Sequence, residues 1–358
     1  MRLTKTVGQY YLGPGSLKKL DSLLKKVIQS PEGRVVFLID HFFQRQNNPI
    51  KDLPLKPEDI TIYLDSTDEP TTSQVDKIVT DLREYGNVDA LVAIGGGATL
   101  DITKASANLI GNGGKAEDYQ GWNLVPEPGI FKIGIPTISG TGAEASRTCV
   151  LMNHEKNLKL GHNSDHTVYD RLILDPNLTI TVPREQYFFT GMDAYIHCIE
   201  SLSGSYRHTF ADALSDATLN LCRKVFLSKN MQSAENREAL MVASYMGGSA
   251  IGNSFVGVVH PFSAGLSMVL GVHHCEGNCI VMNVMDQFYP NETEEFHKMV
   301  QTQSIVIPRG ICSALSEEQH QKLFEATIIH EKPLSNALGE DYKKVLTPDK
   351  VRAIFESM

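Results

Sequence analysis

Two side chains of metal-binding type lie one helical turn apart near the middle of the chain. Asp193 and His197 are separated by four positions in a stretch that reads as a helix. Residues at this spacing project from the same face of a helix, so the carboxylate and the imidazole lie side by side. Both groups are common ligands of divalent metals. The spacing therefore predicts half of a metal site.

A pair of histidines further along the chain offers the other half. His260 and His274 stand at the two ends of a mostly apolar segment. An intervening helix would let both ends approach the face that carries Asp193 and His197. One carboxylate and three neutral imidazoles suit Fe²⁺ or Zn²⁺, and they leave a coordination position for a substrate oxygen. The sequence predicts one divalent metal, and both metals accept this ligand set.

Other side chains near these motifs leave alternatives open. Taken singly, any of these histidines is more often an ordinary, partly buried side chain than a ligand. His273 adjoins His274 and could replace it as the fourth ligand. Cys275 is expected to line the site without binding the metal. His162 and His166 stand in a polar loop, where we expect surface positions, although one of them could reach a substrate.

The elements that must position these residues fall into two halves. Short apolar runs, typical of buried parallel strands, dominate the first half, and amphipathic segments of helical length dominate after Pro183. The expected strands are 34–40, 60–64, 89–94, 131–136, 151–161 and 171–174, and the expected helices include 71–85 and a segment that ends at 109. The sequence thus predicts an α/β domain with a parallel sheet over 1–180 and an all-helical domain over 181–358.

Two glycine-rich turns follow predicted strands of the first domain. Gly95-Gly96-Gly97 leads into a helix, and the turn over 137–144 is expected to do the same. Glycines let the backbone approach an anion, and a helix N-terminus supplies free N–H groups. Either turn alone is also consistent with a plain connection, but two of them favour shared phosphate binding. Asp40 ends a strand at the edge where such sheets bind ligands.

Composition excludes several classes of protein. The net charge is −9, and no basic stripe exists to follow a nucleic-acid backbone. No apolar run approaches the roughly 18 residues that span a bilayer. The N-terminus lacks the apolar core of a secretory signal, so we expect a cytoplasmic protein. The six cysteines form no Cys-x-x-Cys pair, which favours reduced, mostly buried thiols.

Together these motifs resemble the group III, or iron-dependent, alcohol dehydrogenases. The resemblance covers most of the chain and rests on Gly95-Gly96-Gly97-x-x-x-Asp101-x-x-Lys104, Pro136-Thr137-x-Ser139-Gly140-Thr141-Gly142-x-Glu144, Gly191-Met192-Asp193-Ala194-x-x-His197-x-Ile199-Glu200 and the pair His260 and His274, with Asn278 beyond. It implies the dehydroquinate synthase-like fold, in which a dinucleotide-binding α/β domain precedes a helical metal domain and the active site lies between them.

The resemblance also implies roles for individual residues. The implied metal ligands are Asp193, His197, His260 and His274. The residues expected to bind NAD are Asp40, Gly96, Gly97, Thr99, Asp101, Thr137, Ser139, Thr141 and Lys159. Asp40 would hold the adenosine ribose hydroxyls and repel a 2′-phosphate, so NAD is expected rather than NADP. Asp101 would lie near the nicotinamide side and is a candidate catalytic residue. Apart from the resemblance, His273 is the second candidate, because the alcohol proton must leave through water, a ribose hydroxyl or this histidine.

Departures from the family pattern bear on the substrate. Many members carry a proton-relaying histidine four residues after the first downstream ligand, and this chain has Ala264 there. The stretches 258–267 and 273–278 resemble a branch that oxidises the C8 hydroxyl of the sugar acid 3-deoxy-D-manno-octulosonate (Kdo) to an aldehyde, for amination in lipopolysaccharide biosynthesis. Nothing resembles a flavin site, so NAD is the expected acceptor. Arg147 and Arg207 are candidate partners for the substrate carboxylate, although each taken singly is more often a surface arginine with a solvated or paired head.

Other functions are weighed against this one. A glycerol- or butanol-type dehydrogenase would use the same site. A dehydroquinate synthase-like enzyme or a glycerol-1-phosphate dehydrogenase would need clustered cations, and 250–280 contains no Lys or Arg. The complete ligand set disfavours a non-catalytic nucleotide-binding protein. The expected partners are a small alcohol or sugar acid, with no nucleic acid or membrane, and a second copy paired through an edge strand at Tyr10–Leu12.

Overall fold

The computed structural model describes residues 5–28, 33–45, 49–51 and 53–358. Residues 1–4, part of the N-terminal stretch on which the cytoplasmic expectation rests, lie outside these ranges. The chain divides into two compact units, one of Met1–Lys156 with Leu160–Thr181 and the other of Asn157–Lys159 with Val182–Met358. Within the described ranges, no helix is both long and apolar enough to cross a membrane.

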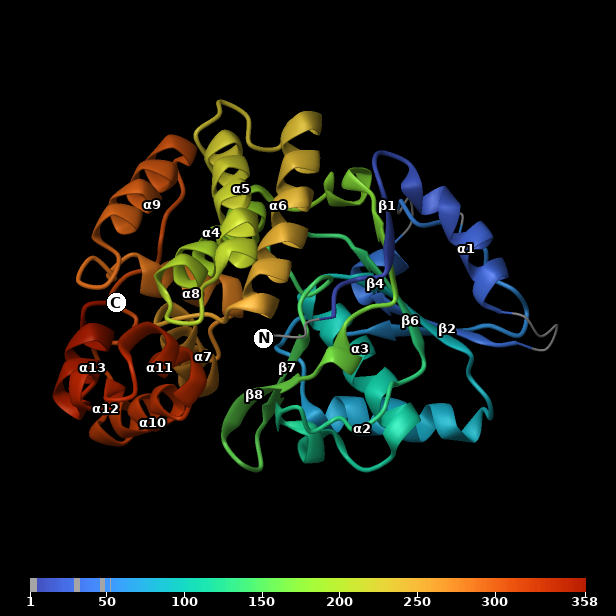
Figure 1. Cartoon of the computed structure of the whole chain (residues 1–358), viewed down its shortest axis with the longest axis horizontal. Helices are drawn as coiled ribbons and strands as arrows, with labels where there is room; N and C mark the ends of the chain where they lie inside the picture. Colours follow the sequence, from blue (N-terminus) through green and yellow to red (C-terminus); the bar gives the residue numbers. More distant parts are fainter. Residues whose placement is uncertain (1–4, 29–32, 46–48, 52) are drawn as a thin grey trace. The chain divides into compact units, whose positions relative to one another are not determined.

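The first unit is built on a six-stranded parallel sheet, which confirms the predicted fold class (Figure 1). The strand order is β1-β9-β6-β4-β2-β3. These strands are β1 (Gln9–Leu12), β2 (Val35–Asp40), β3 (Ile60–Leu64), β4 (Ala90–Gly95), β6 (Phe131–Pro136) and β9 (Arg171–Leu174). β1 therefore forms an edge, as the sequence predicts for Tyr10–Leu12.

A smaller sheet corrects the expected strand at 151–161. This stretch contains parts of two strands joined by a turn, because Asn157 adopts a left-handed φ of 49° that interrupts extended structure. The small sheet has the order β5-β8-β7 and consists of β5 (Gly121–Trp122), β7 (Thr148–Asn153) and β8 (Leu158–Asn163).

Helices cover both faces of the large sheet, which explains its continuously apolar strands. Phe37 of β2 packs in one apolar cluster with residues of α1 (Leu20–Val27). Its neighbours Val36 and Leu38 belong to a second cluster with α2 (Thr72–Glu84) and α3 (Gly97–Asn112). Successive side chains of a strand point to opposite faces, so each face has its own core.

The second unit is helical and has a single apolar core. Its helices are α4 (Arg184–Ser203), α5 (Thr209–Phe226), α6 (Ala234–Asn253), α7 (Val259–Leu270), α8 (His274–Met282), α9 (Pro290–Gln303), α10 (Glu317–Ile328), α11 (Glu331–Leu338), α12 (Tyr342–Val345) and α13 (Pro348–Glu356). α4 packs against α5, α6 and α8. A Cβ on Gly191 of α4 would lie 2.5 Å from the Phe226 ring, so glycine permits this close packing.

Candidate metal centre and cofactor residues

α4 carries three polar side chains on one buried face. Asp193, His197 and Glu200 stand at positions i, i+4 and i+7, which place them in one row along the helix. Asp193 and Glu200 are fully buried, and His197 is only 3% exposed. Because the helix is buried, water cannot satisfy these groups, and they must find partners on neighbouring helices.

Two helix starts bring the downstream histidines to this row. His260 lies in the first turn of α7, and His274 is the first residue of α8. α7 ends at Gly271, whose left-handed φ of 68° terminates the helix and turns the chain. His274 therefore stands after a short connection, and α8 in turn packs against both α4 and α7.

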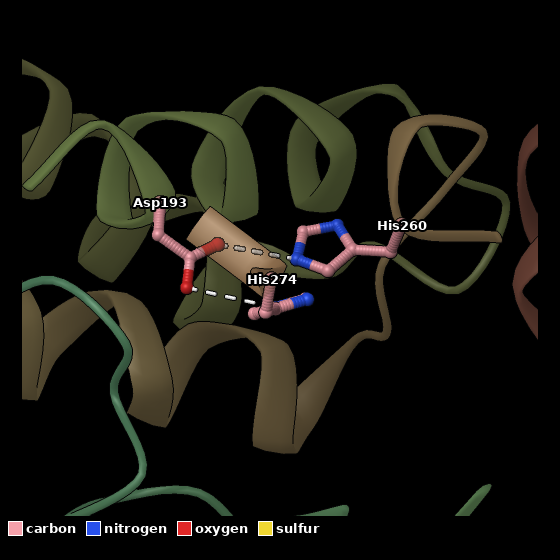
Figure 2. A group of neighbouring side chains, drawn as sticks. All are labelled: Asp193, His260 and His274. Atoms are coloured by element: carbon pink, nitrogen blue, oxygen red, sulfur yellow. Dashed lines mark ion pairs between the residues drawn. The ribbon is translucent and has the colours of Figure 1, made fainter. Parts of the chain in front are cut away.

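The Asp193 carboxylate lies among the imidazoles of His260 and His274 (Figure 2). Its Oδ1 is 3.3 Å from His260 Nε2, and its Oδ2 is 3.7 Å from His274 Nε2. One ligand atom from each residue lies within 4.8 Å of the others. Four ligands at about 2.1 Å from a tetrahedral metal lie about 3.4 Å apart. The donor set and its spacing therefore fit a divalent metal.

His197 stands beside these three residues. Its Nε2 is 3.5 Å from Asp193 Oδ1, and its ring stacks on that of His260 with centroids 4.7 Å apart. His197 Nδ1 is buried and has no hydrogen-bond partner within the described residues. The structure thus brings all four predicted ligands to one place, with His197 at the edge of the three-residue group.

Two further residues support the ligands, and the sequence analysis assigned neither of them a role. Glu200 accepts hydrogen bonds from the backbone N–H of Val259, at 2.5 Å, and from Nδ1 of His260. Asn278 Nδ2 donates to Asp193 Oδ1 at 2.7 Å. The helical spacings of Glu200 from Asp193 and of Asn278 from His274 were the signals available in the sequence. Such outer partners orient metal ligands and fix imidazole tautomers.

The surroundings shift the protonation of the ligands in different directions. Burial opposes ionisation of Asp193, but the nearby His197, His274 and His260 outweigh it and lower the pKa of the carboxyl group. Burial lowers the pKa of His197 to about 4. Burial also tends to lower the pKa of His260, but Glu200 and Asp193 outweigh the effect of burial and raise this pKa to about 9. The carboxylate is thus held ionised, as a metal ligand must be.

The neighbours of the ligands differ in position. His273 is exposed and precedes α8, and its carbonyl accepts a hydrogen bond from Gly277 N. His274, rather than His273, belongs to the group that could hold a metal. Cys275 Sγ donates to Asp193 Oδ2 at 3.6 Å, so the thiol lines the site as expected. Ala264 is buried in α7 and carries no group that could relay a proton.

The two glycine-rich turns of the first unit lie side by side. β4 and β6 are neighbours, and Thr137 N donates to Gly95 O at 3.0 Å. A Cβ on Gly96 would lie 2.8 Å from the Ile138 side chain, so a larger residue would crowd the turns. The hydroxyls of Ser139 and Thr99 are buried without a hydrogen-bond partner in the described part of the chain. Two adjacent turns whose hydroxyl groups lack hydrogen-bond partners fit a binding site for the phosphates of a dinucleotide.

The second turn differs from its prediction. No helix follows it, because residues 143–147 form turns and bends that lead into β7. Buried Lys104 of α3 holds this segment, since its Nζ donates to Thr148 O at 2.7 Å and to Ser146 O at 3.0 Å. The segment after the turn is therefore fixed by a side chain, and the hydroxyls of the turn are not helix caps. Thr141 Oγ1 instead accepts from Ala143 N within the turn, at 3.4 Å.

The remaining predicted cofactor residues occupy separate places. Asp40 ends β2, and its carboxylate accepts from Phe42 N at 2.9 Å and Ser66 Oγ at 2.7 Å. Asp101 of α3 accepts from Val150 N at 2.9 Å. Gly97 begins α3 and is partly buried. Lys159 groups with the second unit. The roles of these residues stay predictions.

One histidine lies differently from its expected position, and two arginines have partners of their own. His162 is fully buried in β8, where its Nε2 lies 2.7 Å from Ala116 O, and burial lowers its pKa to about 4. It is therefore not a surface residue. Arg147 Nε pairs with Asp165 at 3.1 Å, and Arg207 Nη2 pairs with Asp212 at 3.1 Å. Both arginines already have carboxylate partners within the chain.

Comparison with known proteins agrees with this architecture. The model of the iron-containing alcohol dehydrogenase family matches residues 8–176, and that of the C-terminal domain of the Fe-containing alcohol dehydrogenase family matches 188–327. The chain belongs to the iron-containing alcohol dehydrogenase family. This membership confirms the family resemblance found in the sequence.

Two curated relatives are enzymes of different specificity. The chain is 33% identical to a sulfoacetaldehyde reductase of Bilophila wadsworthia (strain 3_1_6), over 60% of this chain and 55% of that protein. It is 30% identical to an NAD-dependent methanol dehydrogenase of Bacillus methanolicus, over 76% of this chain and 71% of that protein. The chain thus spans little more than half the length of the first relative.

Solved structures share the fold over nearly the whole chain. An iron-containing alcohol dehydrogenase from Thermotoga maritima superposes with a TM-score of 0.82 at 22% identity, covering 99% of this chain and 98% of that one. A sulfoacetaldehyde reductase from Bifidobacterium kashiwanohense, solved in complex with NAD⁺, gives 0.80 at 20% identity, with the same coverage. At these identities the likeness establishes the fold alone.

Proposed function

We propose that the protein is a metal-dependent oxidoreductase that transfers hydride between a primary alcohol and NAD. The observation that carries this proposal is the buried Asp193 carboxylate, with the Nε2 atoms of His260, His197 and His274 at 3.3, 3.5 and 3.7 Å. A divalent metal, Fe²⁺ or Zn²⁺, would lower the pKa of an alcohol at this site and so favour hydride loss from its carbinol carbon.

The protein groups supply geometry and electrostatics. Asp193 contributes the single negative charge of the ligand set, and Asn278 orients it through the hydrogen bond to Oδ1. Glu200 accepts the Nδ1 proton of His260, so Nε2, which faces Asp193, would be the ring nitrogen that loses its proton and binds the metal. We propose exposed His273 as a group that passes the alcohol proton to solvent, because position 264 is alanine.

The first unit is the proposed NAD-binding unit. NAD, when bound, accepts the hydride. Gly96, Gly97 and Ser139 are proposed to hold the pyrophosphate, with Thr99, Thr137 and Thr141 completing the hydroxyl-rich turns. Asp40 retains acceptor capacity for ribose hydroxyls, since each carboxylate oxygen can accept more than one hydrogen bond. Asp101 is proposed to lie on the nicotinamide side.

The proposed substrate is an alcohol that carries an acid group. Residues 258–267 and 273–278 support oxidation of the C8 hydroxyl of Kdo, as in Kdo 8-oxidase, with a role in lipopolysaccharide biosynthesis. The likeness to a sulfoacetaldehyde reductase supports a second candidate, reduction of a short aldehyde that carries a sulfonate. The two candidates share an anionic group and differ in its distance from the reacting carbon.

A substrate screen tests the proposed function. NADH absorbance is followed with Kdo, glycerol and butanol, and NADH loss is followed with sulfoacetaldehyde, each with and without added Fe²⁺ or Zn²⁺. We expect metal-dependent turnover that His197→Ala abolishes together with metal binding. Full activity of a metal-free His197→Ala protein would contradict the proposed site.

We also propose a homodimer in the cytoplasm. β1 is an edge strand that pairs only with β9 among the described strands, and its Tyr10 and Leu12 are 47% and 43% exposed. An edge with exposed apolar side chains favours pairing with a second copy. Size-exclusion chromatography with light scattering would show a dimer, and a Tyr10→Lys variant should weaken it.

A further inference from the structure

The connection between α6 and α7 has an unusual backbone conformation just before His260. It comprises residues 254–258, and within it Phe255 adopts a φ of 120°, in a region that side chains other than glycine rarely occupy. The Phe255 ring packs edge-to-face on that of Tyr206, with centroids 5.1 Å apart. Such a conformation is unfavourable by itself and persists only where the surrounding contacts impose it. The contacts that hold this connection therefore also set the position of His260.

The two ends of the connection are attached to the last turn of α4. At its start, Ser254 Oγ lies 2.6 Å from Ser201 Oγ, and both serines are fully buried. Directly after its end, Val259 N donates to Glu200 Oε1 at 2.5 Å. Ser201 and Glu200 are neighbours in α4, so the connection leaves and returns to one place on this helix. Its middle, which contains Phe255, is held by another helix.

Asn336 of α11 supports the middle of the connection. This residue is only 2% exposed, its Nδ2 donates to Val256 O at 3.1 Å, and its Oδ1 accepts from Tyr206 N at 2.9 Å. A Cβ on Gly204, the residue that follows α4, would lie 2.3 Å from Asn336 Nδ2, so glycine permits this close approach. One amide thus joins the α6–α7 connection to the segment that follows α4.

The amide suits this place because it combines a donor and an acceptor in one short side chain. The carbonyl of Val256 needs a donor, whereas the backbone N–H of Tyr206 needs an acceptor. Without the amide, both backbone groups would lose a hydrogen bond in a mostly buried place. The unfavourable conformation of Phe255 would lose its support at the same time.

We propose that Asn336 is a positioning residue of the metal site. By holding the α6–α7 connection, it places His260 so that Nδ1 meets Glu200 and Nε2 faces Asp193 Oδ1 at 3.3 Å. α11 also packs against α7, so the helix that carries Asn336 contacts the helix that it positions. Asn336 is not itself a ligand, and it acts through the orientation of one. This inference rests on the proposed function, because it takes His260 as a metal ligand.

Metal affinity tests this role. We expect Asn336→Ala to raise the dissociation constant for Zn²⁺ about 3- to 10-fold, because the connection relaxes and His260 moves away from Glu200. This factor is smaller than the roughly 10- to 100-fold typical of direct partners of metal ligands. Competition with a chromogenic chelator measures the constant without turnover, and circular dichroism shows whether the variant is folded. Asn336→Leu, which fills a similar space without hydrogen-bonding groups, takes its place if the alanine variant does not fold. An unchanged constant in the folded variant would overturn the proposal.

A buried asparagine near the start of α4 provides the matched control. Asn236 is 6% exposed, and its Nδ2 donates to Ser228 Oγ at 2.9 Å and to Asn230 O at 2.8 Å. Its carbonyl accepts from the hydroxyl of Tyr187, in the first turn of α4, at 3.4 Å. Asn236→Ala should lower the urea midpoint, as Asn336→Ala does, but keep the wild-type affinity for Zn²⁺. Equal losses of affinity in the two variants would show a general effect of stability and overturn the assignment.

A measurement on the metal-free protein separates this inference from the proposed function. The Nδ1 proton of His260, hydrogen-bonded to buried Glu200, should give a downfield imidazole N–H resonance in protein with isotope-labelled histidine, and Glu200→Gln identifies it. We expect this resonance in wild type and Asn236→Ala, and its shift or loss in Asn336→Ala. If wild type binds no metal, the proposed function fails, while the resonance still decides the positioning role. An unchanged resonance in Asn336→Ala would overturn that role.

Discussion

Replacing Glu200 with glutamine should weaken metal binding through the tautomer of His260. The carboxylate accepts two hydrogen bonds, from Val259 N and from His260 Nδ1, and it is fully buried. Glutamine has one oxygen and one NH2 group in the same place. If the oxygen faces Val259, the NH2 group faces Nδ1, and the imidazole must carry its proton on Nε2. That protonated nitrogen cannot bind a metal.

The opposite orientation of the amide is also unfavourable. With the oxygen towards His260, the NH2 group meets the backbone N–H of Val259, and two donors then face each other in a fully buried place. Loss of one buried hydrogen bond to a charged group corresponds to about 1.5–3 kcal/mol. Outer-partner substitutions typically reduce metal affinity about 10- to 100-fold. We therefore expect a dissociation constant for Zn²⁺ or Co²⁺ that rises by this factor.

Competition with a chromogenic chelator measures this effect without any turnover. Glu185→Gln is the matched control, because Glu185 is exposed in the first turn of the same helix. The control should bind metal as wild type does, and circular dichroism should show that both variants are folded. Wild-type metal affinity in a folded Glu200→Gln protein would refute the role assigned to the carboxylate.

Three further predictions concern the first unit. Ser139→Ala should leave the stability of the cofactor-free protein unchanged, since this hydroxyl lacks a partner within the described residues, and should weaken NAD binding by about 1 kcal/mol. The control Ser146→Ala removes a hydroxyl that is bonded to Thr148 O at 3.1 Å, so this variant should instead lower the stability. Calorimetry and urea unfolding distinguish these results, and equal effects would contradict them. Because the pKa of His162 is lowered to about 4, the unfolded chain binds its proton first as pH falls below about 6.5, and stability should decline towards pH 4 by up to about 3 kcal/mol. Urea midpoints of His162→Gln should decline less over this range, and parallel curves would exclude the effect. Gly95→Ala would place a Cβ 2.6 Å from Thr99 Cβ, so the unfolding free energy should fall by about 1–3 kcal/mol, and an unchanged urea midpoint would contradict this packing.

Local patterns explain what the sequence could predict. Residues 35–39 of β2 are buried on both faces and are all apolar, so the position of this strand can be read directly from the sequence. The spacing of Asp193 and His197 identifies one helical face without knowledge of the fold. The second unit was likewise predicted as helical, because apolar positions recur with the helical period.

Contacts between distant segments explain what it could not. Glu200 meets His260 only because α7 packs near the end of α4, and no local pattern encodes this pairing. The break between β7 and β8 depends on the left-handed conformation of Asn157. The turn over 137–144 resembles a helix start, but Lys104, from α3, holds the segment that follows it in a non-helical conformation. For Glu200 and for the segment held by Lys104, a contact between distant parts of the chain decides between locally similar alternatives.

The burial of α4 links metal binding to the stability of the second unit. Asp193 is fully buried and held ionised, and the three imidazoles around it are constrained by stacking and by Glu200. A buried charge is unfavourable unless it is paired. Without the ion, the raised pKa of His260 leaves one positive charge shared between the carboxylates of Asp193 and Glu200, whereas a divalent cation supplies two. The arrangement that makes Asp193 a strong ligand therefore also makes the folded unit depend on the ion, and an ion that binds only the folded state stabilises it.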